Sequence, residues 1–276
     1  MSSDLTKILQ QVCEVAINAG KVILPIYQSD NFEVESKQDN TPLTRADLAS
    51  HHIIIEQLNK LYPSIPCLSE EGKEIQIKHR KDWPYCFIID PLDGTKEFID
   101  KNGEFSVNIA LVKKNKPILG VIYAPVKDVL YFAAEDVGAF KRSPEQESLP
   151  IRARQLEQSK RGAQCTVLMS RRSSQKVIEN ICRQLDEYEI KMCGSALKMC
   201  LIAEGVADLY PKLGPTCEWD TAAAQVILEQ AGGRLVDLHM KPLLYNTKES
   251  LINPYFIAFG DSSFEWQNRL NFEVVS

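Results

Sequence analysis

The chain has 276 residues, of which 44% are hydrophobic and 25% charged, and its formal net charge is −5. This composition is typical of a globular protein with one large core or two closely packed halves. The negative net charge disfavours a duplex-binding surface, which usually needs a basic face, and no apolar run approaches the roughly 20 residues of a membrane span. The segment Met1–Asp4 lacks the basic and then apolar layout of a secretory signal, so we expect a cytoplasmic protein.

In the first half, apolar residues recur at helical spacing from Leu5 to Tyr27, and Thr44 is placed to start a second helix that ends near Leu61. We expect the lysine-rich segment 73–81 to be a solvated, mobile face. Pro91 cannot donate a ladder hydrogen bond, so the strand before it is expected to end there. The strand patterns of this half cover 32–37, 67–69, 85–89, 106–113, 118–123, 129–134 and 138–142.

The polar segment 143–150 is the best internal boundary, and it divides the chain into halves 1–145 and 146–276. Beyond it strands and helices alternate. The expected strands are 166–169, 189–192, 207–210 and 234–237, and the expected helices are 175–185, 196–204 and 220–230. An α+β half followed by an α/β half favours stacked layers of helix and sheet.

The eight cysteines are scattered, with no Cys-x-x-Cys pair. Most of them lie in apolar surroundings, which is typical of buried, reduced thiols. Neither a disulfide framework nor a zinc site is therefore expected.

The six residues from Asp90 to Thr95, Asp-Pro-Leu-Asp-Gly-Thr, directly follow an apolar strand. Two carboxylates, Asp90 and Asp93, lie within one turn of each other at the end of the strand. Burial of both without a counter-charge would force one carboxyl to keep its proton. A divalent cation relieves that conflict, and oxygen ligands with no His or Cys nearby favour Mg²⁺ over Zn²⁺. The alternative is an ordinary Asx-type turn, because Asp, Pro and Gly are common turn residues.

Other acidic residues lie in similar settings, each with a simple structural explanation. Glu70 and Glu71 follow a short strand, where adjacent acids are usually solvated. Asp47 and Asp220 lie at expected helix starts, where helix capping alone would explain them. A carboxylate at a helix N-terminus is also held ionised, so capping and a functional role are compatible.

Together these segments resemble the inositol monophosphatase superfamily of Mg²⁺-dependent, lithium-sensitive phosphatases. Its signatures, D-P-I/L-D-G-T-x-x-F/Y and W-D-x-A-A/G, are matched at 90–98 and 219–223. The resemblance implies an α+β / α/β fold, a layered α-β-α-β-α sandwich of the inositol monophosphatase and sugar phosphatase type. A finer match, to CysQ-type 3'(2'),5'-bisphosphate nucleotidases, is carried by 68–71, 93–99, 102–111, 119–125, 210–216 and the C-terminal 241–243 and 249–254.

The resemblance implies roles for individual residues. Asp47 and Thr95 match a pair that orients the attacking water, and Glu70 joins them in the catalytic set. The metal ligands would be Glu70, Asp90, Asp93, Asp220 and the carbonyl of Leu92, holding two Mg²⁺ ions and a looser third. The substrate-binding set would be Gly94, Thr95, Ser170, Gly194, Ser195, Lys198, Lys212 and Asp220.

The implied reaction is hydrolysis of the 3'-phosphate of adenosine 3',5'-bisphosphate to AMP and phosphate by a metal-activated water. 3'-Phosphoadenylyl sulfate is a second expected substrate and would link the enzyme to sulfate assimilation. An inositol monophosphatase or sugar phosphatase with the same chemistry stays open, and so does a non-catalytic nucleotide-binding regulator. The expected partner is thus a small bisphosphorylated nucleotide, with monomer and homodimer both open.

One departure bears on the substrate. These nucleotidases commonly read Ser-Arg-Ser-His where this chain has Ser170-Arg171-Arg172-Ser173. The substrate contact of the missing His cannot be carried over. Either Arg172 replaces it or the affinity for the nucleotide is weaker.

Overall fold

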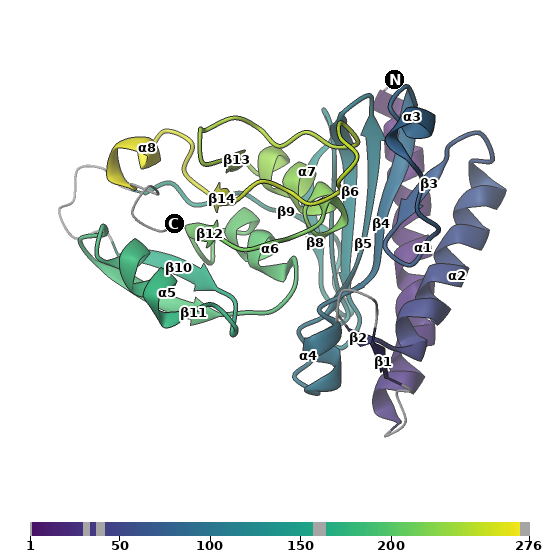
Figure 1. The fold of residues 1–276 in the computed structure, drawn as a ribbon, viewed down its shortest axis with the longest axis horizontal. Coiled ribbons are helices and arrows are strands. Elements are labelled where there is room, and N and C mark those ends of the chain that lie inside the picture. The colour runs from purple at the N-terminus through teal and green to yellow at the C-terminus, as the bar shows by residue number, and fades with distance from the viewer. Residues whose placement is uncertain (1, 30–33, 37–41, 157–163, 271–276) are drawn as a thin grey trace.

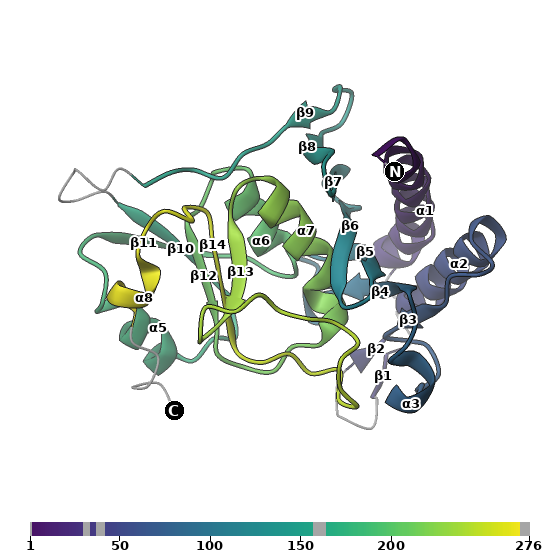
Figure 2. The same cartoon turned by 90° about the horizontal axis from the view of Figure 1, so that it is seen from above.

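The computed structural model describes residues 2–29, 34–36, 42–156 and 164–270. Two sheets and three layers of helix alternate through the molecule (Figure 1). This arrangement confirms the expected α-β-α-β-α sandwich. Figure 2 shows the same order of layers from above, with the seven-stranded sheet between α1 and α2 on one side and α6 and α7 on the other.

The outer helices α1 (Ser2–Gln28) and α2 (Arg45–Leu61) pack against each other and against one face of the larger sheet. Both follow the expected helical spacing, because their apolar stripes are buried against that face. Thr44 caps α2: its hydroxyl accepts a hydrogen bond from the Ala46 N–H at 3.2 Å. The expected start of this helix is confirmed.

The larger sheet has the strand order β3-β4-β5-β6-β7-β8-β9, in which β3 and β4 are parallel and the other neighbours are antiparallel. Its strands are β3 (Cys67–Ser69), β4 (Tyr85–Asp93), β5 (Ser106–Lys113), β6 (Lys116–Ala124), β7 (Val129–Ala134), β8 (Gly138–Arg142) and β9 (Leu149–Pro150). The short strands β1 (Glu35–Ser36) and β2 (Pro42–Leu43) form a separate antiparallel pair. Much of the strand expected at 32–37 lies outside the described residues.

The expectation that β4 stops at Pro91 is wrong. Its pairing with β5 resumes at Asp93, after a register shift between Asp90 and Asp93. Pro91 therefore lies in a bulge, where a missing backbone donor costs no ladder hydrogen bond. The strand continues past the proline, and Asp93 is therefore part of the sheet.

The expected solvated face at 73–81 is confirmed for its lysines, Lys73, Lys78 and Lys81, which are exposed, but it is wrong for Arg80. The segment contains the short helix α3 (Ile77–Arg80), and Arg80 is only 1% exposed. Its guanidinium donates to the Asn246 Oδ1 at 2.6 Å and to the Glu249 carbonyl at 2.7 Å. The hydrogen-bond partners of the Arg80 guanidinium thus come from a loop almost 170 residues away. The local sequence could not indicate this contact.

The smaller sheet has the order β11-β10-β12-β14-β13, with β10 parallel to both neighbours and β14 antiparallel to both. Its strands are β10 (Cys165–Met169), β11 (Tyr188–Met192), β12 (Leu209–Lys212), β13 (Arg234–Asp237) and β14 (Phe256–Phe259). The sequence patterns missed β14 and the short helix α8 (Trp266–Arg269). The division of the chain at 145/146 stays a prediction, although β9 pairs with β8 beyond it.

Helices α6 (Leu197–Ala203) and α7 (Ala222–Gln230) form the middle layer, and α5 (Gln175–Cys182) lies with α8 on the outer face of the smaller sheet (Figure 1). At Gly120 of β6, an added Cβ would lie 2.2 Å from the Ala223 carbonyl oxygen. Only glycine therefore permits this close approach of α7 to the sheet. The approach brings the residues just before α7 beside the end of β4.

Two simpler expectations concern the thiols and the membrane. Within the described part of the chain no disulfide links the eight cysteines, and burial raises the pKa of Cys86 to about 12. The expectation that most of the cysteines are buried thiols is thus confirmed, and Cys67 and Cys217 are only half-buried. Among the helices described, none has the length and apolar character needed to span a bilayer.

Candidate active site

Three carboxylates from distant parts of the sequence meet where β4 bulges. Carboxyl oxygens of Asp90, Asp93 and Asp220 lie within 4.8 Å of one another. Asp90 and Asp93 come from β4, and Asp220 ends the 3₁₀ helix η1 (Glu218–Asp220) directly before α7. The expected meeting of the acid turn with the Trp-Asp motif is therefore present in the structure.

Local hydrogen bonds hold the acid turn in shape. The Leu92 N–H donates to the Asp90 Oδ1 at 3.0 Å, and the Ser50 hydroxyl donates to the Pro91 carbonyl at 2.7 Å. Gly94 has φ +92° and precedes α4 (Thr95–Ile99). A side chain there would be strained by this φ. The glycine lets the chain turn from the strand into α4 beside the carboxylates.

Asp47 and Thr95 lie together next to this turn. The Thr95 hydroxyl is 3.2 Å from the Asp47 Oδ1, to which it donates. The Asp47 Oδ2 accepts from the Thr44 N–H at 2.8 Å and from the Thr44 hydroxyl at 2.5 Å. Asp47 is thus the N3 residue of a capping box, which confirms the capping interpretation, and it is also the hydrogen-bond partner of Thr95.

Glu70 follows β3, and its N–H donates to the Ile89 carbonyl of β4 at 3.1 Å. Its charge contributes to raising the pKa of Asp90 and of Asp220. The structure therefore brings Glu70 into the electrostatic neighbourhood of the three-carboxylate cluster. Its place follows from parallel pairing of β3 with β4.

The pKa shifts show the strain of this arrangement. Burial, followed by the charges of Glu70 and Asp93, raises the pKa of Asp90 well above its usual value. Burial and the Asp93 charge raise the pKa of Asp220 to about 8. Burial raises that of Asp93 to about 6, against the opposing effect of the Lys198 ammonium. A cation bound among these oxygens would relieve the repulsion, and the donor set fits a hard divalent ion.

A cavity of about 180 Å³ opens beside the cluster. Asp93 and Asp220 line it together with six residues of the expected substrate-binding set: Gly94, Ser170, Gly194, Ser195, Lys198 and Lys212. Leu92 and Thr95 lie next to the cavity rather than in its wall. The cavity wall thus brings together eight of the residues that the resemblance selected, from both halves of the chain.

Two aromatic wall residues were missed. Tyr210 and Phe256 line the cavity and contact each other edge to face, with ring centroids 5.8 Å apart. Tyr210 opens one of the segments that carried the finer resemblance, so a signal for it was present. Phe256 belongs to the unforeseen strand β14, and the sequence held no signal for it.

Lys198 is buried, with 4% of its surface exposed. Its ammonium donates to the Ser195 carbonyl at 2.6 Å and the Cys193 carbonyl at 3.3 Å, and lies 5.1 Å from the centroid of the Tyr210 ring. A solvated surface lysine would have none of these contacts. Its charge therefore adds a fixed positive potential beside Asp93.

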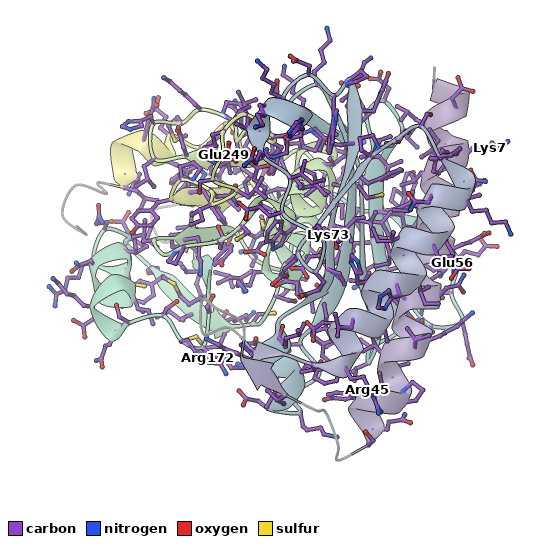
Figure 3. All side chains as sticks on the ribbon, turned by 45° about the vertical axis from the view of Figure 1, so that its right-hand side comes forward. Lys7, Arg45, Glu56, Lys73, Arg172 and Glu249 are labelled. Carbon is purple, nitrogen blue, oxygen red and sulfur yellow. The ribbon has the colours of Figure 1, made fainter. Side chains whose placement is uncertain are left out.

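Arg172 does not line the cavity in the place of the missing His. Its guanidinium donates to the Glu97 Oε1 at 2.8 Å and to the Asp100 Oδ2 at 2.6 Å. Figure 3 places Arg172 on the side of the molecule where the smaller sheet faces α4. Arg172 thus forms a contact between the two halves of the chain.

Comparisons with known proteins agree with this geometry. The inositol monophosphatase family model matches residues 4–267. The 3'(2'),5'-bisphosphate nucleotidase CysQ of Haemophilus influenzae is 41% identical over 274 residues, covering 96% of this chain and 97% of that protein. Its counterpart in Escherichia coli K12 is 43% identical over 252 residues, covering 90% and 98%.

Solved structures show the same likeness. CysQ from Bacteroides thetaiotaomicron, described as a bacterial member of the inositol monophosphatase family, superposes with a TM-score of 0.78 at 39% identity. That match covers 93% of this chain and 98% of the other. The suhB protein of Bartonella henselae gives 0.76 at 26% identity and covers 95% of both chains.

Proposed function

Because the chain belongs to the inositol monophosphatase family, we propose that it is a Mg²⁺-dependent phosphatase acting on adenosine 3',5'-bisphosphate. The products are AMP and phosphate, and 3'-phosphoadenylyl sulfate is a second substrate. The observation that carries this proposal is a cluster of three carboxylates within 4.8 Å, two of which, Asp93 and Asp220, line a cavity that is also lined by two lysines. The curated relatives named above support the choice of nucleotide.

The proposed metal ligands are the side chains of Glu70, Asp90, Asp93 and Asp220 and the carbonyl of Leu92. Their oxygens suit two Mg²⁺ ions and a looser third. Bound Mg²⁺ would stabilise charge on the phosphoryl group and lower the pKa of a water molecule.

Asp47 and Thr95 orient the attacking water in this proposal. The Thr95 hydroxyl donates its proton to the Asp47 Oδ1 at 3.2 Å. The lone pairs of the hydroxyl oxygen can then accept a hydrogen bond from water. Two bonds from Thr44 fix the other Asp47 oxygen, so the carboxylate keeps one orientation. Asp47 is then the proton acceptor at the end of this chain.

The remaining wall residues bind the substrate. Lys198 and Lys212 supply positive charge for the two phosphates, and the amides of Gly94 and Thr95 at the start of α4 hold the scissile group. Ser170, Gly194 and Ser195 contact the nucleotide from the smaller-sheet side. A cytoplasmic location stays a prediction from the sequence.

The test compares phosphate release from adenosine 3',5'-bisphosphate and from inositol 1-phosphate, each with Mg²⁺, with EDTA, and with Mg²⁺ plus lithium against a sodium control. We expect turnover of the nucleotide that requires Mg²⁺ and is inhibited by millimolar lithium. Preference for inositol 1-phosphate would reassign the substrate while keeping the chemistry. Tight binding of the nucleotide without any turnover would instead indicate a regulator and refute the proposal.

A further inference from the structure

The turn after β10 carries two adjacent arginines that reach across to the other half of the chain. The Arg171 Nη2 lies 2.6 Å from the Glu104 Oε2. Arg172 forks to two carboxylates, the Glu97 Oε1 at 2.8 Å and the Asp100 Oδ2 at 2.6 Å. Each of these ion pairs joins residues more than 60 positions apart.

Two of the three carboxylates that pair with these arginines belong to the cavity wall or contact it: Glu97 lines the cavity, and Glu104 contacts Gly194 of the wall. The Glu104 Oε2 also accepts a hydrogen bond from the Gly194 N–H at 2.8 Å. This one oxygen therefore links the turn that carries Arg171 to the turn that carries Gly194. Glu97 lines the cavity, and its Cγ lies 2.6 Å from where a Cβ on Gly194 would be. Ser170, directly before the arginines, lines the cavity.

We propose that Arg171 and Arg172, with Glu97, Asp100 and Glu104, form a clasp that positions the 170–173 turn and so sets the affinity for the nucleotide. The inference rests on the proposed function for its substrate. The arginines are positioning residues, because their contacts are to the wall and not to the cavity. This assigns a role to the motif in which the usual His is absent.

The clasp is suited to tuning affinity rather than holding the fold together. The Arg171 and Arg172 side chains are 38% and 45% exposed, and exposed ion pairs contribute little to folding stability. The geometry of Ser170 beside the substrate is more sensitive, because a small displacement weakens a hydrogen bond steeply. Loss of the clasp should therefore change KM without changing the unfolding midpoint.

A direct electrostatic effect of Arg172 on the anionic substrate is the competing explanation, and Asp100 separates the two. Asp100 holds one arm of the fork but is not part of the cavity wall, and its side chain is 54% exposed. If only local charge matters, Asp100→Ala removes a negative charge and lowers KM. If the clasp positions the turn, the same change removes a tether and raises KM.

The experiment compares Arg172→Ala, Asp100→Ala, the double variant and a matched control, Arg183→Ala. Arg183 forms an exposed pair with Glu179 just after α5 that does not cross to the other half. We expect KM for adenosine 3',5'-bisphosphate to rise about five-fold in Arg172→Ala, and to rise also in Asp100→Ala, with kcat changed less than about two-fold. The KM of the double variant should be no higher than that of Arg172→Ala, because Arg172→Ala already removes the ion pair with Asp100.

Hydrogen exchange of backbone amides in 168–175 gives a second readout that needs no substrate. Exchange should be faster in Arg172→Ala and Asp100→Ala than in wild type and in Arg183→Ala, at unchanged unfolding midpoints. An unchanged KM in Arg172→Ala, a lowered KM in Asp100→Ala or unchanged exchange overturns the clasp. A wild-type protein inert toward the nucleotide refutes the proposed function and the affinity role, and exchange then decides whether the clasp itself exists.

Discussion

Replacing Asp90 by Asn tests the site most directly, because the change removes charge and little else. The Asp90 Oδ1 accepts the Leu92 N–H at 3.0 Å, and the amide oxygen of Asn can accept the same bond. The bulge that carries Asp93 should therefore persist. Any effect on activity then comes from the lost carboxylate rather than from a rearranged turn.

Without metal, Asp90→Asn should stabilise the protein. Asp90 is 1% exposed, and burial together with the charges of Glu70 and Asp93 raises its pKa well above the usual value. The charged form is thus costly near neutral pH, and each pKa unit corresponds to about 1.4 kcal/mol. Removing the charge should stabilise the metal-free form by about 1–3 kcal/mol. For a chain of this size that is a rise of roughly 3–10 °C in Tm.

With Mg²⁺, the same variant should lose both protection and activity. A ligand at about 100 times its Kd stabilises a protein by about 2.7 kcal/mol, and the variant should show much less of this effect. We expect kcat to fall by about 1,000-fold or more, because the carboxylates set metal position and charge stabilisation.

Thermal unfolding in EDTA and in saturating Mg²⁺, together with phosphate release from adenosine 3',5'-bisphosphate, checks these outcomes. The wild-type protein is the reference in each condition. Near-normal turnover of Asp90→Asn in saturating Mg²⁺ would refute the reasoning. A metal-free variant that melts below the metal-free wild type would refute the electrostatic part alone.

Three further predictions concern pH, packing and substrate charge. The folded-state pKa of Asp93 is raised to about 6 and that of Asp220 to about 8, so the metal-free folded protein binds more protons than the unfolded chain at these pH values. Its free energy of unfolding should therefore fall as the pH rises from about 4 through these values. Melting in EDTA between pH 5 and 8 checks this, and a rising Tm would contradict it. Gly120→Ala should lower the free energy of unfolding in urea by about 1–3 kcal/mol, because its Cβ would lie 2.2 Å from a carbonyl oxygen of α7. The control is Gly214→Ala, whose Cβ would meet only the Lys212 Nζ, at 4.0 Å. Lys198→Met should lower kcat/KM for the nucleotide about 10- to 100-fold through loss of a fixed buried charge, and an unchanged kcat/KM would remove Lys198 from the binding set.

Local sequence patterns predicted most of the regular structure. Helices α1 and α2 and strands β3 to β8 were recognised from apolar spacing, a capping threonine and turn residues, which act over a few positions. Strand β14 was missed, although its four residues are all buried. A short apolar run carries no period of its own, and its pairing with β12 and β13 depends on residues far along the chain.

The sequence by itself determined which residues are the candidates for the site. The order Asp-Pro-Leu-Asp-Gly-Thr, the Trp-Asp pair and Glu70 were readable as acids at strand ends and helix starts, and their resemblance to one family selected them. Their meeting in space was an inference, because a carboxylate in a loop and one in a metal site look alike in sequence.

Only the tertiary structure decided how these residues are held. The close approach of α7 to Gly120 brings Asp220 beside Asp90, and carbonyls of the 193–195 turn hold the ammonium of Lys198. The pairing of Arg172 with Glu97 depends on the turn after β10 lying against α4. Burial and ion pairing between distant residues depend on the folded path of the whole chain, whereas helix and strand patterns depend on neighbours within a few positions.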